Sequence, residues 1–281
     1  MKKLAIALGS ILLAGCTEAG LKLANLPAKF SATETHKNLA YGPDEAHKLD
    51  VYVPEEASED ALPVVLFFYG GRWTNGSREM YPFVAESFVD EGYVAVIADY
   101  SKYPRVRFPA FVEDGAAALA WVYNNIERYG GNPEQIYLSG HSSGAHIGAL
   151  LVADDQYMQA QGLEPDIISA FAGLAGPYDF EPDAEDLKDM FGPPDNYPQM
   201  QVTTFIDGDE PPMLLMWGDA DSTVWRRNLD LLEQKIRAQN GQVETRIYPG
   251  IDHVGIVASL TWFYQNRRPV LGDMVSFFRQ H

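Results

Sequence analysis

Cysteine is almost absent from this chain, since Cys16 is the only one among 281 residues. A single cysteine excludes any disulfide within the chain, so a hydrophobic core has to supply the stability of the fold. Basic residues are scarce as well: 21 lysines and arginines stand against 39 aspartates and glutamates, and the formal net charge is −18. So acidic a surface argues against nucleic acid and anionic lipid head groups as partners.

Motifs for metals and nucleotides are also missing. The sequence shows no cluster of metal-ligand residues, no glycine-rich phosphate loop and no cofactor signature. We therefore expect neither a metal nor a cofactor, and chemistry that side chains carry by themselves. No internal repeat is visible, and the length suits one large α/β domain.

The N-terminus has the pattern of a secretory signal, with two lysines and then an apolar stretch (residues 2–14). That stretch is too short to cross a bilayer. The tetrapeptide LAGC at 13–16 resembles the bacterial lipobox, which implies cleavage before Cys16 and lipidation of its sulfur. Thr17 follows in place of aspartate, which favours the outer membrane of a bacterial envelope. An ordinary secreted protein with a chance cysteine is the alternative.

These features predict three parts of the chain. Residues 1–15 are the signal peptide, residues 16–30 a tether, and residues 31–281 a single domain. Residues 176–212 are rich in proline and acidic side chains and interrupt the pattern of the domain. We expect them to form a small cap insertion over the C-terminal edge of a sheet, where open α/β folds bind their ligands.

Buried strands and helices alternate along the domain. Residues 47–54 alternate in polarity and stop at a proline, which predicts an early antiparallel strand. Further strands are predicted at 63–69, 93–100, 135–138, 168–174, 213–217 and 243–248. Helical spacing occurs at 81–91, 111–128, 227–239 and the C-terminus. The pattern predicts a mostly parallel sheet with helices on both faces.

The pentapeptide GHSSG at 140–144 follows one predicted strand and precedes a run of small residues. Strand, tight turn and helix, with Ser142 at the apex, is the arrangement of a nucleophile elbow. Ser143 lies off the apex, so we expect its backbone to matter more than its hydroxyl. His141 and His146 flank the turn and are expected to pack or hydrogen-bond there.

A serine hydroxyl needs a base, and the base is expected after the serine in the chain. Only two of the six histidines come late enough, and one of them, His281, is the chain end. His253 follows the last predicted strand, where a loop places it over the serine. A surface histidine of the loop is the alternative interpretation.

The acid that orients this histidine should lie between the serine and the histidine. Asp219 and Asp221 both follow the predicted strand at 213–217. We favour Asp221, and expect Asp219 to form a turn by bonding local amides. Asp252 is the direct neighbour of His253, and neighbouring side chains seldom face one another.

A developing oxyanion requires backbone donors near the serine. The glycine pair at 70–71 follows the first core strand, so we expect the amides of Gly71, Arg72 and Ser143 to donate hydrogen bonds to the oxyanion. Trp73 and Trp225 border the same loops. Each is a candidate wall for an acyl or aryl group, with core packing an equal alternative for Trp225.

From about Lys48 to the C-terminus, the chain resembles the α/β-hydrolase superfamily. The likeness is greatest to carboxylesterases with a His-Gly-Gly-x-Trp oxyanion motif, which include feruloyl and acetyl-xylan esterases, kynurenine formamidase-like enzymes and prenylcysteine methylesterase-like proteins. The matching segments are residues 69–73, 99–100, 129–133 with 135–138, and 140–146. Tyr69 departs from the motif, where the group has a histidine that braces the loop.

The resemblance implies the roles of the residues singled out above. The implied triad is Ser142, Asp221 and His253, and the implied oxyanion donors are Gly71, Arg72 and Ser143. It further implies hydrolysis of a small short-chain or aryl carboxylic ester through an acyl-enzyme. An arylformamidase-like amide hydrolase is the alternative activity, and a non-catalytic lipoprotein with a hydrolase fold is the alternative class.

Overall fold

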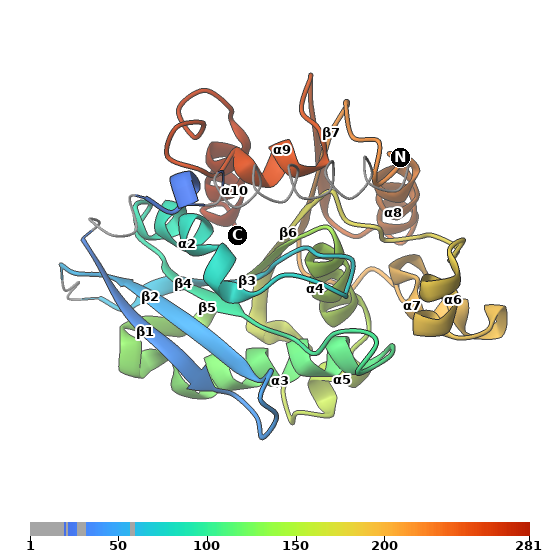
Figure 1. Cartoon of the computed structure of the whole chain (residues 1–281), viewed down its shortest axis with the longest axis horizontal. Helices are drawn as coiled ribbons and strands as arrows, with labels where there is room; N and C mark the ends of the chain where they lie inside the picture. The colour runs from blue at the N-terminus through green and yellow to red at the C-terminus, as the bar shows by residue number, and fades with distance from the viewer. Residues whose placement is uncertain (1–19, 21, 27–31, 57–59) are drawn as a thin grey trace, which may run out of the picture.

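The computed structural model describes residues 20, 22–26, 32–56 and 60–281. In this part of the chain an eight-stranded sheet forms the centre of the molecule, in the order β1-β2-β4-β3-β5-β6-β7-β8 (Figure 1). Strand β2 pairs antiparallel with both β1 and β4. The remaining neighbours run parallel, which confirms the mostly parallel sheet.

The bounds of the elements agree with most predicted ranges. The strands are β1 Thr33–Ala40, β2 Lys48–Pro54, β3 Leu62–Phe68, β4 Val94–Ala98, β5 Gly131–His141, β6 Ile168–Leu174, β7 Met213–Gly218 and β8 Val243–Tyr248. The longer helices are α2 Pro82–Val89, α3 Ala110–Asn125, α4 Ser143–Ala153, α8 Arg227–Ala238 and α10 Val270–Phe278. Short helices are α5 Gln156–Gln159, α6 Glu185–Phe191, α7 Tyr197–Met200 and α9 His253–Ala258.

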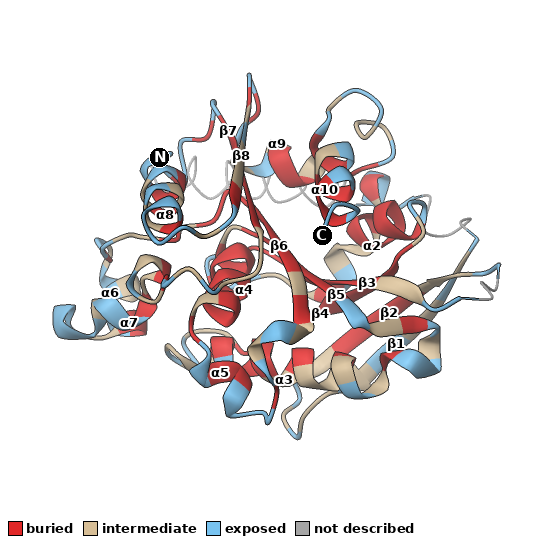
Figure 2. Cartoon of the chain, turned by 180° about the vertical axis from the view of Figure 1, so that it is seen from behind, coloured by how far each residue is buried: buried red, intermediate tan, exposed pale blue. Residues whose placement is uncertain are grey.

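Helices cover both faces of the sheet. On one face α10 lies beside α2, because the Phe278 ring stacks on Tyr137 of β5 at 4.6 Å and lies 6.4 Å from the Phe88 ring. On the other face α3 packs against α4, where a Cβ built on Gly115 would lie 2.8 Å from the Ile147 side chain. Figure 2 shows the consequence, a continuous buried band along the central strands.

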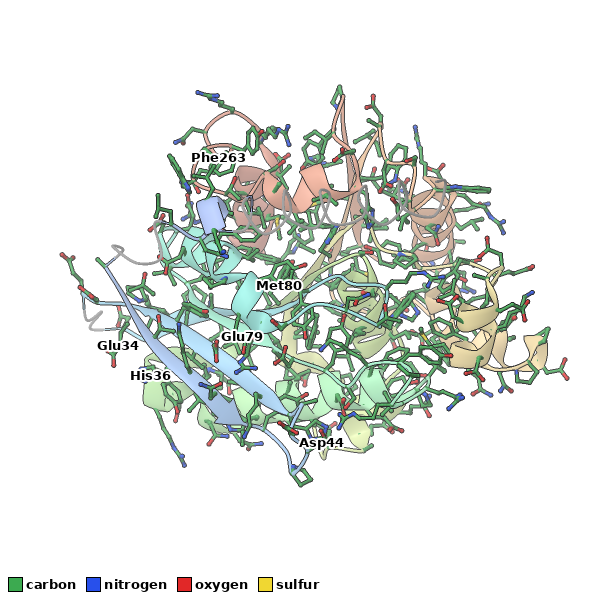
Figure 3. All side chains as sticks on the ribbon, viewed as in Figure 1. Glu34, His36, Asp44, Glu79, Met80 and Phe263 are labelled. Carbon is green, nitrogen blue, oxygen red and sulfur yellow. The ribbon has the colours of Figure 1, made fainter. Side chains whose placement is uncertain are left out.

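The sequence patterns missed β1. Its residues, TETHKNLA, are mostly polar and none is fully buried, because the strand has a neighbour on one side only. Glu34 and His36 lie on this edge strand (Figure 3), with His36 Nε2 3.2 Å from Glu34 Oε1. Hydrophobic alternation marks strands that bury one face, so an edge strand of this composition gives no such signal.

Residues 176–212 lie between β6 and β7 and contain α6, α7 and two short 3-10 segments, η5 Pro194–Asn196 and η6 Val202–Thr204. The signal peptide and Cys16 lie outside the described residues, as does most of the tether, so these domain boundaries remain predictions. Residues 22–24 of the tether are helical. Of the helices that the structure describes, none is long and apolar enough to cross a bilayer.

Candidate active site

Ser142 stands at the turn between β5 and α4. Its backbone has φ 54° and ψ −122°, a conformation that residues with a Cβ rarely adopt. The turn is close-packed, since a Cβ on Gly140 would lie 2.5 Å from the Gly144 backbone, and one on Gly144 would lie 2.0 Å from the Phe68 carbonyl oxygen. Glycine at both positions therefore permits the turn that lifts the serine above the sheet.

Three side chains from distant parts of the chain meet at this point. His253 Nε2 lies 2.9 Å from Ser142 Oγ, and His253 Nδ1 lies 2.7 Å from Asp221 Oδ2. His253 opens α9, and the helix is capped by Asp252, whose carboxylate accepts the Gly255 amide at 2.6 Å. Asp252 is thus engaged with its own helix rather than with the imidazole.

The structure brings Asp221, and not Asp219, to the imidazole. The other oxygen of Asp221 accepts the amides of Thr223 at 2.7 Å and Val224 at 3.0 Å. Burial raises the pKa of Asp221, but these hydrogen bonds and the one from His253 outweigh it and hold the pKa below its ordinary value. Asp219 instead accepts the Gly250 amide at 2.6 Å and fixes the turn that leads to the histidine.

Two further histidines of the elbow have structural contacts. His141 Nε2 lies 2.8 Å from the carbonyl oxygen of His253, so the elbow supports the loop of the imidazole directly. Burial lowers the pKa of His141 to about 3, which keeps it neutral. His146 Nε2 lies 2.7 Å from the carbonyl oxygen of Met200, at the end of α7.

The loop after β3 borders the serine from the other side. A Cβ on Gly70 would lie 3.0 Å from the Cβ of Ser142. Arg72 and Trp73 both have φ 56°, so the loop follows an unusual path. Ser143 is the first residue of α4, and its amide has no acceptor within the helix. The loop and the helix start therefore lie on either side of Ser142.

A cavity of about 580 Å³ opens beside Ser142 and has both predicted tryptophans in its lining. Trp73 is 3 % exposed and stacks on Phe180 at 5.8 Å. Trp225 is 72 % exposed, so the alternative that it packs in the core is wrong. The cavity is also lined by apolar and acidic side chains of the insertion, Phe180, Leu187, Glu181 and Asp183.

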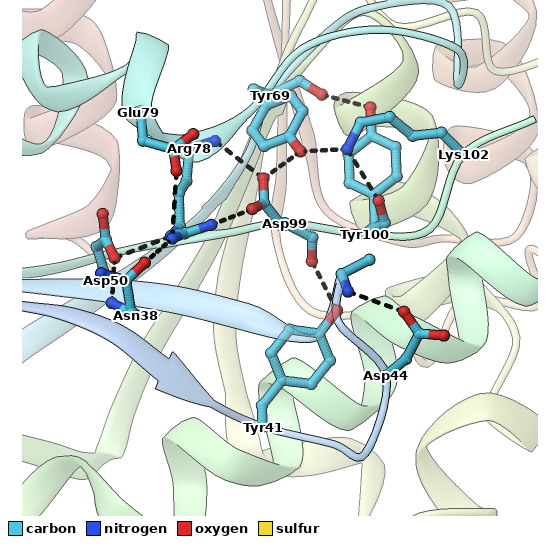
Figure 4. Close-up of polar contacts among 11 residues, drawn as sticks. Asn38, Tyr41, Asp44, Asp50, Tyr69, Arg78, Glu79, Asp99, Tyr100 and Lys102 are labelled. Carbon is cyan, nitrogen blue, oxygen red and sulfur yellow. Dashed lines mark hydrogen bonds and ion pairs between the residues drawn. The ribbon is translucent and has the colours of Figure 1, made fainter.

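Behind the loop after β3 lies a polar cluster whose pairing the sequence analysis did not predict (Figure 4). Arg78 bonds Asp50 at 2.9 Å and also pairs with Asp99, and all three are buried. Tyr69 donates to Asp99 at 2.5 Å and accepts from Lys102 at 2.8 Å. Arg78 lies in a polar segment without periodicity, so no pattern indicated it, whereas Asp99 belongs to a segment that matches the family.

No cation site emerges from the part of the chain that the structure covers. Among residues 20, 22–26, 32–56 and 60–281, no group of three or more histidine, cysteine, aspartate or glutamate side chains is arranged to hold a metal ion.

Sheet order, elbow and triad geometry together define an α/β-hydrolase fold, and solved structures share it. Esterase B from Lactobacillus Rhamnosis (HN001) aligns with a TM-score of 0.80 at 18 % identity, over 100 % of this chain and 96 % of that one. A truncated carbohydrate esterase from gut microbiota aligns with a TM-score of 0.77 at 21 % identity, over 88 % of this chain and 95 % of that one.

The family model BD-FAE matches residues 49–236, about two thirds of the chain. The chain belongs to the BD-FAE family, which confirms the resemblance to α/β-hydrolase esterases. It is 32 % identical to esterase LipQ of Mycobacterium tuberculosis (strain ATCC 25618 / H37Rv) over 219 residues, 70 % of this chain and 51 % of LipQ.

A second relative is named for a different activity. The chain is 34 % identical to kynurenine formamidase of Danio rerio over 154 residues, 54 % of this chain and 49 % of the relative. The matched region thus spans about half the length of each of these two curated relatives.

Proposed function

We propose that this chain is a serine carboxylesterase that hydrolyses short-chain or aryl carboxylic esters. The observation that carries the proposal is the continuous contact from Ser142 Oγ through the His253 ring to the Asp221 carboxylate, at 2.9 and 2.7 Å. The name of the relative LipQ, an esterase, supports the same activity.

In the proposed mechanism, Ser142 Oγ attacks the ester carbonyl while His253 Nε2 takes its proton. Asp221 stabilises the imidazolium through the hydrogen bond at Nδ1. The negative charge on the former carbonyl oxygen is met by the amides of Gly71, Arg72 and Ser143. His253 returns the proton to the departing alcohol, and water, deprotonated by His253, then releases the acid from the acyl-enzyme.

The lining of the cavity supports a compact substrate. Buried Trp73 and half-buried Phe180 and Leu187 offer an apolar surface beside the serine. Exposed Trp225 adds an aromatic face at the margin. Apolar walls with a few polar groups are typical of small-molecule sites.

A fluorophosphonate probe tests the proposal. We expect the probe to label the wild-type chain, and Ser142→Ala to abolish both labelling and hydrolysis of p-nitrophenyl acetate, a loss of at least about 10⁴-fold. Ser276→Ala, which removes an exposed hydroxyl of α10, is the matched control and should behave as the wild type. A wild-type chain that the probe leaves unlabelled would favour the non-catalytic hydrolase-fold lipoprotein.

The relative kynurenine formamidase supports a second candidate, cleavage of an aryl formamide by the same residues. The two activities are separated by measuring p-nitrophenyl acetate, butyrate and octanoate beside methyl ferulate and N-formylkynurenine. Hydrolysis of the short-chain or aryl esters is the expected result. Turnover of N-formylkynurenine alone would replace the ester proposal by the formamidase.

We further propose attachment to a bacterial envelope, most simply its outer membrane, through a lipid on Cys16. Exposed apolar residues support this: Leu23 is 51 %, Leu26 44 % and Trp262 46 % exposed, and Trp262 Nε1 donates to the Leu23 carbonyl at 3.3 Å. Labelled palmitate should be incorporated into the wild type but not into Cys16→Ala. Density-gradient fractionation should place the labelled protein with the outer membrane. A labelled protein that stays soluble would contradict the proposal.

A further inference from the structure

Tyr69 occupies the position of the motif histidine, and its hydroxyl makes two hydrogen bonds to charged side chains. The hydroxyl donates to Asp99 Oδ1 at 2.5 Å and accepts from Lys102 Nζ at 2.8 Å (Figure 4). A carboxylate only accepts and an ammonium only donates, so both roles of the phenol are used. The ring is stacked between Tyr81 at 5.3 Å and Tyr100 at 5.0 Å. The side chain is therefore fixed in position and direction.

Lys102, which is partly buried, completes this arrangement. Its Nζ also donates to the Tyr100 carbonyl at 3.0 Å and lies 5.2 and 5.0 Å from the ring centroids of Tyr69 and Tyr100. Burial lowers the pKa of Lys102, while the charges of Asp99 and Glu79 act against that shift. One ammonium thus ties together the two tyrosines that follow β3 and β4.

The tyrosines connect to both sides of the proposed oxyanion hole. The Tyr100 hydroxyl donates to the carbonyl oxygen of Tyr69 at 3.0 Å and lies 3.3 Å from Ser143 Oγ. Tyr69 directly precedes the loop that carries Gly71 and Arg72, and Ser143 is the donor of the elbow. A single buried phenol therefore lies between the two elements that have to stay at a fixed separation.

We propose that Tyr69 and Lys102 are positioning residues, which act through Tyr100 to set the separation between the oxyanion loop and the elbow. The inference rests on the proposed esterase function, because it assigns these residues to stabilisation of the oxyanion. Donors of this kind act only when they are held where charge develops, so a small displacement slows the reaction more than it weakens substrate binding.

Tyr69→Phe is the first test, since it keeps the stacked ring and removes the hydroxyl. We expect kcat per active site to fall about tenfold or more, with KM changed less than about twofold. Inactivation by the fluorophosphonate should slow in parallel, because it develops charge at the same place. The matched control is Tyr52→Phe, which removes a buried hydroxyl that has no hydrogen-bond partner among the described residues. This control should retain kcat.

Lys102→Met is the second test and guards against a misfolded first variant, because it keeps most of the side-chain length. It should show the same fall in kcat with little change in KM, and titration of active sites with the probe corrects for inactive protein. Wild-type kcat per titrated site in both variants would overturn the inference, as would an equal loss in Tyr52→Phe. An unreactive wild type would instead refute the esterase function itself.

Discussion

The two walls of the cavity beside Ser142 are built differently. The wall formed by the loop after β3 and the turn after β5 is backed by buried charges, with Arg78 7 % exposed between Asp50 and Asp99. The wall formed by the insertion has its ion pairs at the surface, where Arg107 and Asp189 are 55 % and 49 % exposed. Arg72 reaches from the first wall to Asp186 of the second, again at the surface.

The two walls therefore differ in how firmly their polar contacts fix the neighbouring backbone. Buried partners have no water to replace a lost contact, so the first wall keeps the loop after β3 in one arrangement. Exposed pairs are screened by solvent and contribute little to stability. The surface pairs of the insertion can therefore be lost at little cost, whereas the His146–Met200 hydrogen bond and the stacking of Phe180 on Trp73 still join the insertion to the first wall.

The largest expected effect comes from breaking the buried cluster. Arg78→Met leaves Asp50 and Asp99 buried without their cation, and we expect the free energy of unfolding to fall by about 3–5 kcal/mol. Arg107→Met, which breaks the exposed pair with Asp189, should leave the free energy of unfolding unchanged within error. Urea unfolding of both variants measures the contrast. Similar losses in the two would show that the walls do not differ in this way.

The next effect concerns His146, which joins the walls by bonding the Met200 carbonyl. Burial lowers the pKa of His146 from its ordinary 6.5 to about 4. Between these values the unfolded chain binds a proton that the folded chain excludes, so stability falls as pH falls through that window. In His146→Gln, which keeps a donor, about 2 kcal/mol of the wild-type loss between pH 7 and 5 should disappear. Equal losses in both proteins would place the acid sensitivity elsewhere.

A smaller effect is expected at the margin of the cavity. Trp225→Ala removes an exposed aromatic face, so kcat/KM for methyl ferulate should fall about three- to tenfold, while p-nitrophenyl acetate is hydrolysed as before. Steady-state kinetics on the two esters measures the ratio. An equal fall in kcat/KM for both substrates would mean that Trp225 supports the loop that carries Asp221 rather than contacting an aryl group.

The smallest effect is expected where the walls meet at the surface. Asp186→Asn removes the charge that pairs with Arg72 and should change kcat less than about twofold. Because salt screens exposed charges, about 1 M NaCl should shift the wild-type rate in the same direction and have little effect on the variant. If the kcat of Asp186→Asn equals that of the wild type while salt changes the rates of both proteins strongly, other charges cause the salt dependence.

Different parts of this molecule were predictable to different degrees. Strands β6 and β8 were predicted at their observed bounds, because they give distinct patterns between clear breaks. Strand β1 was missed because it is polar and lies at the edge. In the site, the turn motif indicated Ser142, and chain order indicated His253 and two candidate acids, Asp219 and Asp221. The role of Arg78 instead depends on partners 28 and 21 residues away.

By itself the sequence determined the alternation of strand and helix, the serine turn, and the order in which serine, acid and histidine follow one another. These are local properties, because periodicity, glycine spacing and strand ends are all written within short segments. Only the tertiary structure decided which aspartate faces His253, which tryptophan is buried, and how Tyr69 replaces a histidine. Each of those outcomes depends on side chains that meet across the sheet, and no short segment contains both partners.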